Sequence, residues 1–259
     1  MNKMKNIKGL LIDLEGVLYS DNKVIEGSIE TIDKLRQKYK IRFLTNTTTT
    51  SRNSIFKKLI NLEFNLKEDD IFTPSIAINY FLRNNNINNI FLMTNPDLFP
   101  DFKNFIIDDK SPKAVIIGDI YKEFNWITLN HVFQLINNNE CLLIALHKNK
   151  YCKREDTISL DLGPFVSALE YASNKNAIVI GKPEKDFFDL AINSLNLNKD
   201  EILMIGDDII SDIKGSKDNL IKAIQVKTGK YQKHDENSNF IQPDIRIKSI
   251  NDLPNVINN

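Results

Sequence analysis

The stretch GLLIDLEGV, residues 9–17, decides the fold that this sequence predicts. Its first six residues are apolar apart from Asp13 and are too few for a helix, so they predict a buried β-strand. Asp13 and Glu15 stand two residues apart at the end of this strand, and Gly16 follows at a tight turn. Because ligands of open α/β sheets bind at the carboxyl ends of strands, the two acids are expected to project into a binding crevice. A polar strand end that leads into a loop explains the same residues equally well.

Predicted strands and helices alternate along the rest of the chain. Strands are predicted at residues 9–14, 41–45, 90–93, 114–118, 142–146, 177–180, 202–205 and 222–226, and helices at 26–38, 51–59, 76–84, 127–137, 162–175, 184–195, 210–217 and 250–257. This alternation is typical of parallel sheets, and the pattern restarts near residue 76. We therefore predict an α/β fold in which a Rossmann-like parallel-sheet core, residues 1–76 and 179–259, carries an inserted α/β module at 77–178.

Composition and charge exclude several classes of protein. Lys+Arg and Asp+Glu both number 34, so the formal net charge is zero and no overall field favours nucleic acid or an anionic membrane. Cys141 and Cys152 have no metal-site spacing and fit a reducing compartment. The N-terminal residues lack the long apolar core of a signal peptide, and no apolar run approaches the roughly 20 residues that span a bilayer. We expect a cytoplasmic protein with no nucleic-acid or membrane partner.

Two further strand ends carry polar groups. Thr45 and Asn46 follow the second predicted strand, where a hydroxyl and free backbone N–H groups can hold a phosphate, although helix capping explains them at least as well. Lys182 precedes Pro183, which we place at the first position of a predicted helix. A cation beside a helix N-terminus opposes the helix dipole and indicates an anionic partner, unless Lys182 is simply a solvated surface lysine.

Three carboxylates, Asp207, Asp208 and Asp212, follow the apolar strand at 202–205. Such crowding is costly unless a cation or solvent relieves the repulsion. Hard oxygen ligands suit Mg²⁺, which needs only one or two carboxylates besides waters and substrate phosphate. Asp208 or Asp212 also suits the cap of the following helix, and we expect capping to be partly true as well.

Together these signals resemble the four-motif pattern of the haloacid dehalogenase superfamily. The order is an acid after the first strand, a threonine after the second, then a lysine, and finally a strand followed by paired acids. The length and α/β pattern of the insertion are similar to the type II cap of the NagD-like subfamily. Five segments of the sequence also resemble members of that subfamily: HKNKYCKRED (147–156), LGPFVSALEYA (162–172), VIGKPEKDFF (179–188), MIGDDIISD (204–212) and QVKTGKY (225–231). Residues 77–178 would then form the cap domain.

The resemblance implies a Mg²⁺-dependent phosphatase that acts on a small phosphorylated substrate. Asp13 would attack phosphorus and form an aspartyl-phosphate, which water would hydrolyse. Thr45, Asn46 and Lys182 would bind the phosphoryl oxygens, and Lys182 would also neutralise charge on Asp13. The implied metal-site residues are Asp13, Glu15 through its backbone carbonyl, Asp207 and Asp208, with Asp212 in support.

Glu15 departs from the usual pattern of the superfamily, which has Asp at this position as general acid and base. Glutamate can do acid–base chemistry. Its extra methylene moves the carboxyl by about a bond length, and misplacement of that order can cost roughly 10²-fold in rate. Slow turnover, or a good leaving group as in a phosphoramidate or pyrophosphate, would fit this departure.

The inserted module offers candidates for substrate contacts in a basic cluster after the strand at 142–146. His147, Lys148 and Lys153 are the residues of this cluster that we select, although a solvated loop explains them equally well. Relatives with this cap often form dimers, so the resemblance also implies a homodimer. Two other functions stay open: a phosphotransferase that uses the same intermediate, and a degenerate member that binds a phosphorylated ligand or partner. The presence of Asp13, Lys182 and Asp207 argues against full degeneracy.

Overall fold

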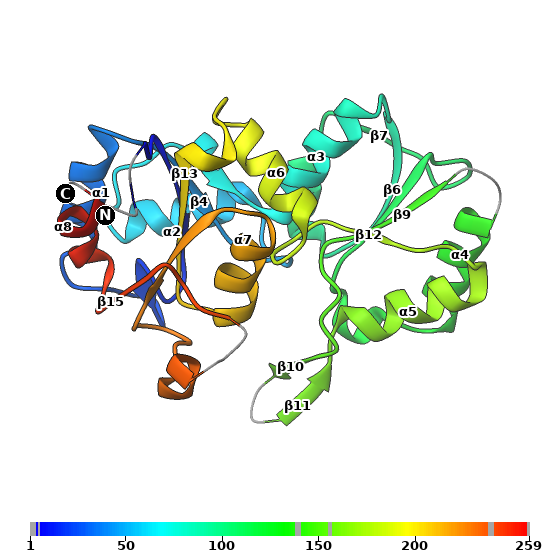
Figure 1. The fold of residues 1–259 in the computed structure, drawn as a ribbon. Coiled ribbons are helices and arrows are strands. Elements are labelled where there is room, and N and C mark those ends of the chain that lie inside the picture. Colours follow the sequence, from blue (N-terminus) through cyan, green and yellow to red (C-terminus); the bar gives the residue numbers. More distant parts are fainter. Residues whose placement is uncertain (1–3, 5, 138–140, 155–156, 238–240, 258–259) are drawn as a thin grey trace. The chain divides into compact units, whose positions relative to one another are not determined.

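The computed structural model describes residues 4, 6–137, 141–154, 157–237 and 241–257, apart from the side chains of residues 153, 154 and 237. Backbone packing divides the chain into two units. The core unit consists of residues 1–45, 53–72 and 182–259, and the insert unit of residues 46–52 and 73–181. Figure 1 shows the elements of both units in sequence colours.

The core unit is built on a six-stranded parallel sheet with the strand order β15-β14-β13-β1-β4-β5. The strands of this sheet are β1 (Gly9–Asp13), β4 (Lys40–Leu44), β5 (Ile71–Phe72), β13 (Ile202–Gly206), β14 (Lys222–Val226) and β15 (Ile245–Ile247). A short antiparallel pair, β2 (Tyr19–Ser20) and β3 (Lys23–Val24), follows β1. The chain builds the sheet outward from β1 on one side and from β13 on the other. The boundary between β1 and β13 is therefore a topological switch point, where α/β sheets bind their ligands.

Apolar side chains hold helices on the core sheet. The helices are α1 (Ser28–Arg36), α2 (Arg52–Asn61), α6 (Lys185–Asn193), α7 (Gly215–Asp218) and α8 (Leu253–Ile257). Leu10 and Ile12 of β1 pack into one cluster with Ile32 of α1, Leu59 of α2 and Leu253 of α8. Because neighbouring residues of a strand point to opposite faces, this cluster covers one face of the sheet.

The insert unit has its own five-stranded parallel sheet with the order β12-β9-β8-β6-β7. Its strands are β6 (Asn89–Met93), β7 (Ile106–Ile107), β8 (Ala114–Ile117), β9 (Leu142–Ala145) and β12 (Ile178–Val179), and its helices are α3 (Pro74–Asn84), α4 (Trp126–Asn137) and α5 (Leu162–Ser173). Helices α4 and α5 pack together against β8 and β9 through a shared apolar cluster. In Figure 1 the antiparallel hairpin of β10 (Tyr151–Arg154) and β11 (Thr157–Leu160) extends away from this sheet.

The sequence predicted an α/β fold with parallel sheets, and that prediction is confirmed. Two predicted helices differ in kind. The segment predicted as a helix at 210–217 is a π-helical turn, η5 (Ile209–Lys214), followed by α7, and the last helix begins as a 3₁₀ turn, η7 (Ile250–Asp252). None of the described helices is long and apolar enough to cross a membrane.

Candidate active site

Asp13 is the last residue of β1, which is buried along its whole length. Its strand neighbours are β13 on one side and β4 on the other. Asp207 directly follows β13, so the carboxylates of Asp13 and Asp207 come from the two strands that meet at the switch point. Both residues are buried, at 8% and 2% exposure. The structure thus places two acids from distant parts of the sequence at one sheet edge.

Lys182 lies between two of the buried carboxylates. Its ammonium group donates to Asp13 Oδ1 and to Asp212 Oδ1, the latter at 2.7 Å. Burial alone would lower the pKa of Lys182, but the charges of Asp13 and Asp212 outweigh this effect and raise it. The expectation that Pro183 opens a helix was wrong, because α6 begins at Lys185 and Glu184 is its N-cap residue. The anionic partners of Lys182 in the structure are the chain's own carboxylates.

Asp13, Asp207 and Asp212 form a compact acidic cluster, each with a carboxylate oxygen within 4.8 Å of the others. Three carboxylates and one ammonium leave this cluster with a net charge of −2. Burial raises the pKa of Asp13 despite the nearby Lys182. Burial is also the main cause that raises the pKa values of Asp207 and Asp212 to about 6, with a neighbouring carboxylate adding to it in each case. Oxygen donors with uncompensated charge −2 fit a divalent hard cation.

Asp208 and Asp212 occupy different positions around η5. Asp208 caps the turn, since its Oδ1 accepts from the N–H groups of Ile210 and Ser211 at 2.9 and 3.0 Å. Burial alone would raise the pKa of Asp208, but the Ser211 N–H and the charge of Lys230 outweigh it and lower that pKa. Asp212 is fully buried and is the acid that joins Asp13 and Asp207 in the cluster. The structure therefore brings Asp212, rather than Asp208, next to the first two acids.

A loop after β14, residues 228–230, closes over the same edge. The Thr228 hydroxyl donates to the Gly16 carbonyl, and the Lys230 N–H donates to Asp207 Oδ2 at 2.6 Å. Gly16 and Gly229 both have positive φ, and a Cβ on either would come within 2.2 Å of Asp207 Oδ2. Only glycine fits such a close approach without strain. This loop fixes the Asp207 carboxylate against the turn that follows Asp13.

The buried side-chain amide of Gln225 holds the backbone of Asp207 in place. Gln225 has no exposed surface, and its side-chain NH₂ donates to the Asp207 carbonyl and to Asp235 Oδ2, both at 3.2 Å. Arg246 Nε in turn donates to Gln225 Oε1 at 2.9 Å. The sequence predicted no role for Gln225 or for the loop 228–230, although QVKTGKY was among the segments with a family resemblance. The signals that could have identified them are the polar Gln225 within a predicted strand and the position of the loop directly after that strand.

The other predicted site residues of the core sheet edge are placed as follows. Thr45 is buried and directly follows β4, whose last residue, Leu44, pairs with Asp13 in the sheet. Glu15 is exposed and forms an isolated β-bridge with Tyr19. Asn46 belongs to the insert unit, so its predicted role in phosphate binding stays a prediction.

In the insert unit, the predicted basic cluster divides into different environments. His147 is buried, and its Nε2 lies 3.6 Å from Asp161 Oδ1 while its Nδ1 accepts from the Asn149 N–H. Lys148 pairs with Glu170 at 2.5 Å. The side chain of Lys153 lies outside the described residues. The contacts of His147 and Lys148 hold the segment that leads into the β10–β11 hairpin.

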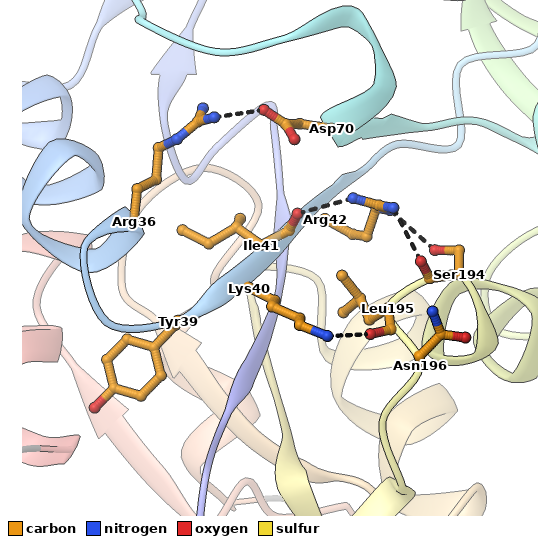
Figure 2. A pocket seen from close by; sticks show the side chains of 9 residues that line it. All are labelled: Arg36, Tyr39, Lys40, Ile41, Arg42, Asp70, Ser194, Leu195 and Asn196. Atoms are coloured by element: carbon orange, nitrogen blue, oxygen red, sulfur yellow. Dashed lines mark hydrogen bonds and ion pairs between the residues drawn. The ribbon is translucent and has the colours of Figure 1, made fainter.

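A cavity of about 360 Å³ lies at the opposite, amino-terminal end of β4. Figure 2 shows its cations directed at protein acceptors: Arg36 at Asp70, Lys40 at Leu195 and Arg42 at Ser194. Lys40 and Arg42 donate to backbone carbonyls just past the C-terminus of α6, at 2.9 and 3.0 Å. Cations are stabilised at a helix C-terminus. Lys40 and Arg42, which line this cavity, therefore anchor α6 to the sheet. The candidate active site lies at the other, carboxyl edge of the sheet.

The replacement Arg42→Met should reduce stability without changing turnover per folded molecule. Arg42 is half-buried and also donates from Nε to Ser194 Oγ at 2.9 Å, so the variant leaves two acceptors without this donor. We expect a loss of about 1–3 kcal/mol, or a fall in melting temperature of about 2–12 °C. Thermal denaturation measures this, with the exposed Lys38→Met as control. An equal shift in both variants would contradict the anchoring role.

The chain belongs to the haloacid dehalogenase-like hydrolase family. A family model described as haloacid dehalogenase-like hydrolase matches residues 10–105, and a second, HAD-hydrolase-like model matches residues 179–253. The human haloacid dehalogenase-like hydrolase domain-containing protein 2 is 39% identical over 91% of this chain and 90% of its own length. The phospholysine phosphohistidine inorganic pyrophosphate phosphatase of Danio rerio is 33% identical over 95% of this chain and 93% of its own.

Solved structures agree with this assignment. The 4-nitrophenylphosphatase of Thermotoga maritima is 25% identical, with a TM-score of 0.86 and coverage of 98% of both chains. NagD from E. coli K-12 is 21% identical, with a TM-score of 0.84 over 95% of this chain and 98% of its own, and it shares the fold. The predicted membership of the haloacid dehalogenase superfamily and of its NagD-like subfamily is confirmed.

Proposed function

We propose that this chain is a Mg²⁺-dependent phosphatase that hydrolyses a small phosphorylated substrate through an aspartyl-phosphate on Asp13. The observation that carries the proposal is the buried cluster of Asp13, Asp207 and Asp212 with Lys182 at the carboxyl edge of the core sheet. A pure binding site does not need a nucleophilic carboxylate at a strand end. The phosphatase names of several relatives support the same class of reaction.

In the first step, a carboxylate oxygen of Asp13 attacks phosphorus, and the bond from phosphorus to the leaving group breaks. Lys182 holds the charge of Asp13 and orients its Oδ1. Thr45 and Asn46 would bind the transferring phosphoryl oxygens. Asp13, Asp207, the carbonyl of residue 15 and the supporting acids Asp208 and Asp212 would hold Mg²⁺, which supplies charge stabilisation of the phosphoryl group.

In the second step, water attacks phosphorus and the bond to the Asp13 oxygen breaks. Phosphate leaves and the Asp13 carboxylate is regenerated. Glu15 would protonate the leaving group in the first step and take the proton from water in the second. The chain's main contribution is to position these groups and to match their charges.

The test is phosphate release from a panel of substrates, measured with Mg²⁺ and with EDTA. The panel contains p-nitrophenyl phosphate, pyrophosphate, imidodiphosphate, phosphohistidine, pyridoxal phosphate and sugar phosphates. Metal-dependent release supports the proposal and ranks the substrate classes. Failure to release phosphate from any of them, by folded protein that binds Mg²⁺, would favour a protein that binds a phosphorylated ligand.

The variant Glu15→Asp tests the acid–base role. We expect faster turnover of p-nitrophenyl phosphate and slower turnover of phosphoramidates, because the shorter side chain moves the carboxyl by about a bond length. The measurement is the ratio of kcat/KM between the two substrate classes in both proteins. An unchanged ratio would show that Glu15 does not select the leaving group.

We also propose different roles for the two parts of the chain. Residues 1–76 and 179–259 would form the catalytic core, and residues 77–178 the cap that selects the substrate, with His147, Lys148 and Lys153 as contact candidates. A cytoplasmic location and a homodimer stay predictions from the sequence. Size-exclusion chromatography with light scattering would test the dimer.

A further inference from the structure

Lys230 differs from the other cation of the site in its exposure. The side chain of Lys182 is 3% exposed, and its ammonium is bound to both Asp13 and Asp212. The side chain of Lys230 is 75% exposed, although its residue is anchored at the same sheet edge. Lys230 therefore presents a positive charge to solvent beside the buried acids.

The position of Lys230 is fixed at both of its ends. Its backbone N–H donates to Asp207 Oδ2 at 2.6 Å, and its ammonium lies 3.2 Å from Asp208 Oδ2. The other carboxylate oxygen of Asp208 caps η5. An exposed ion pair of this kind contributes little to stability, so the fold alone gives little reason for a lysine here.

We propose that the Lys230 ammonium binds a negatively charged group in the part of the substrate that is not transferred, so that the site favours leaving groups that are themselves acidic. The inference rests on the proposed phosphatase function and names Lys230 as the residue that gives this specificity. Its chemical basis is that an ammonium has three donors, of which Asp208 engages one.

Charge balance leads to the same assignment. Asp13, Asp207, Asp208 and Asp212 against Lys182 and Lys230 give −2, which a divalent cation would neutralise. Lys182 is buried and already donates to the carboxylates of Asp13 and Asp212, so its charge is shared within the cluster. A second phosphoryl or a carboxylate on the leaving group therefore needs a cation at the rim, and Lys230 is such a cation. A site that places a cation beside a charged group of one substrate discriminates against substrates that lack this group.

The test compares Lys230→Met with wild type on inorganic pyrophosphate, whose leaving group is a phosphate, and on p-nitrophenyl phosphate, whose leaving group carries no second acid. With Mg²⁺ present, we expect kcat/KM to fall about 10- to 100-fold for pyrophosphate, the scale of one charge-assisted hydrogen bond, and by no more than about 5-fold for p-nitrophenyl phosphate. Lys230→Arg should restore most of the loss. Equal losses on both substrates, or none on pyrophosphate, would overturn the assignment.

Two additions separate this inference from the proposed function. Lys227→Met is the matched control, because Lys227 lies three residues away and pairs with Glu236 at 2.5 Å instead of with the acids after β13. It should leave both rates unchanged. Calorimetric binding of methylenediphosphonate, whose P–C–P bridge is not hydrolysed, and of inorganic phosphate tests Lys230 even if wild type turns over neither substrate. Weakening of methylenediphosphonate alone by Lys230→Met supports the inference, and equal weakening of both ligands contradicts it.

Discussion

Asp13→Asn should lower phosphate release on the order of 10⁴-fold or more. The amide is a poor nucleophile, so the covalent step through the aspartyl-phosphate is lost. The change should not unfold the protein, because burial raises the pKa of Asp13 and its ionised form is therefore costly inside the fold. Lys182 keeps Asp212 as a partner in the variant. The measurement is steady-state phosphate release with Mg²⁺, on protein whose melting temperature has been checked.

The matched control is Asp33→Asn, an exposed carboxylate on α1 that lies outside the candidate site. It should retain wild-type turnover. Acid-quenched reaction with a ³²P-labelled substrate should leave label on wild type and none on Asp13→Asn. Activity of Asp13→Asn within about tenfold of wild type would remove Asp13 as the nucleophile and with it the proposed mechanism.

The sequence predicted the strands that carry the site because fully buried strands read as short apolar runs. β1 and β13 are such runs, and the acids Asp13 at the end of β1 and Asp207 directly after β13 are visible without a structure. The short strands β5 and β15 show no period in the sequence and were not predicted, whereas the two-residue β12 was predicted within 177–180. The β10–β11 hairpin was also not predicted, because polar and charged residues interrupt its apolar ones.

The spacing of the acids after β13 could not show which of them caps the following turn and which joins the acidic cluster. Asp208 and Asp212 are both plausible caps in sequence. In the structure the π-helical turn η5 begins right after Asp208 and includes Asp212, whose Oδ1 accepts from Lys182 while its Oδ2 accepts from the Asp208 N–H. Gln225 and Lys230 reach Asp207 only because β14 lies beside β13. Such contacts depend on the strand order, which the sequence does not state.

Mg²⁺ should stabilise the protein much more at pH 7.5 than at pH 5. In the metal-free protein the pKa values of Asp207 and Asp212 are raised to about 6 from an ordinary 3.8, mainly by burial. The folded state therefore binds protons more tightly than the unfolded state. This contribution to stability is fully present below about pH 4 and is lost as the pH rises through about 6. A shift of about two pKa units corresponds to roughly 3 kcal/mol for one group, and the two groups are not independent.

A divalent cation should relieve the charge that remains above pH 6. At a concentration about 100 times its Kd, the cation would add about 2.7 kcal/mol to the free energy of unfolding. This corresponds to a rise of roughly 5–11 °C in melting temperature for a chain of this size. At pH 5 protons compete for the same carboxylates, so the rise should be smaller. Thermal denaturation in EDTA and in MgCl₂ at equal ionic strength measures both effects. Asp207→Asn should reduce the difference between the two pH values, since it removes one of the two titrating carboxylates while Asp212 remains. An equal response to Mg²⁺ at both pH values, or in the variant, would show that the ion binds elsewhere.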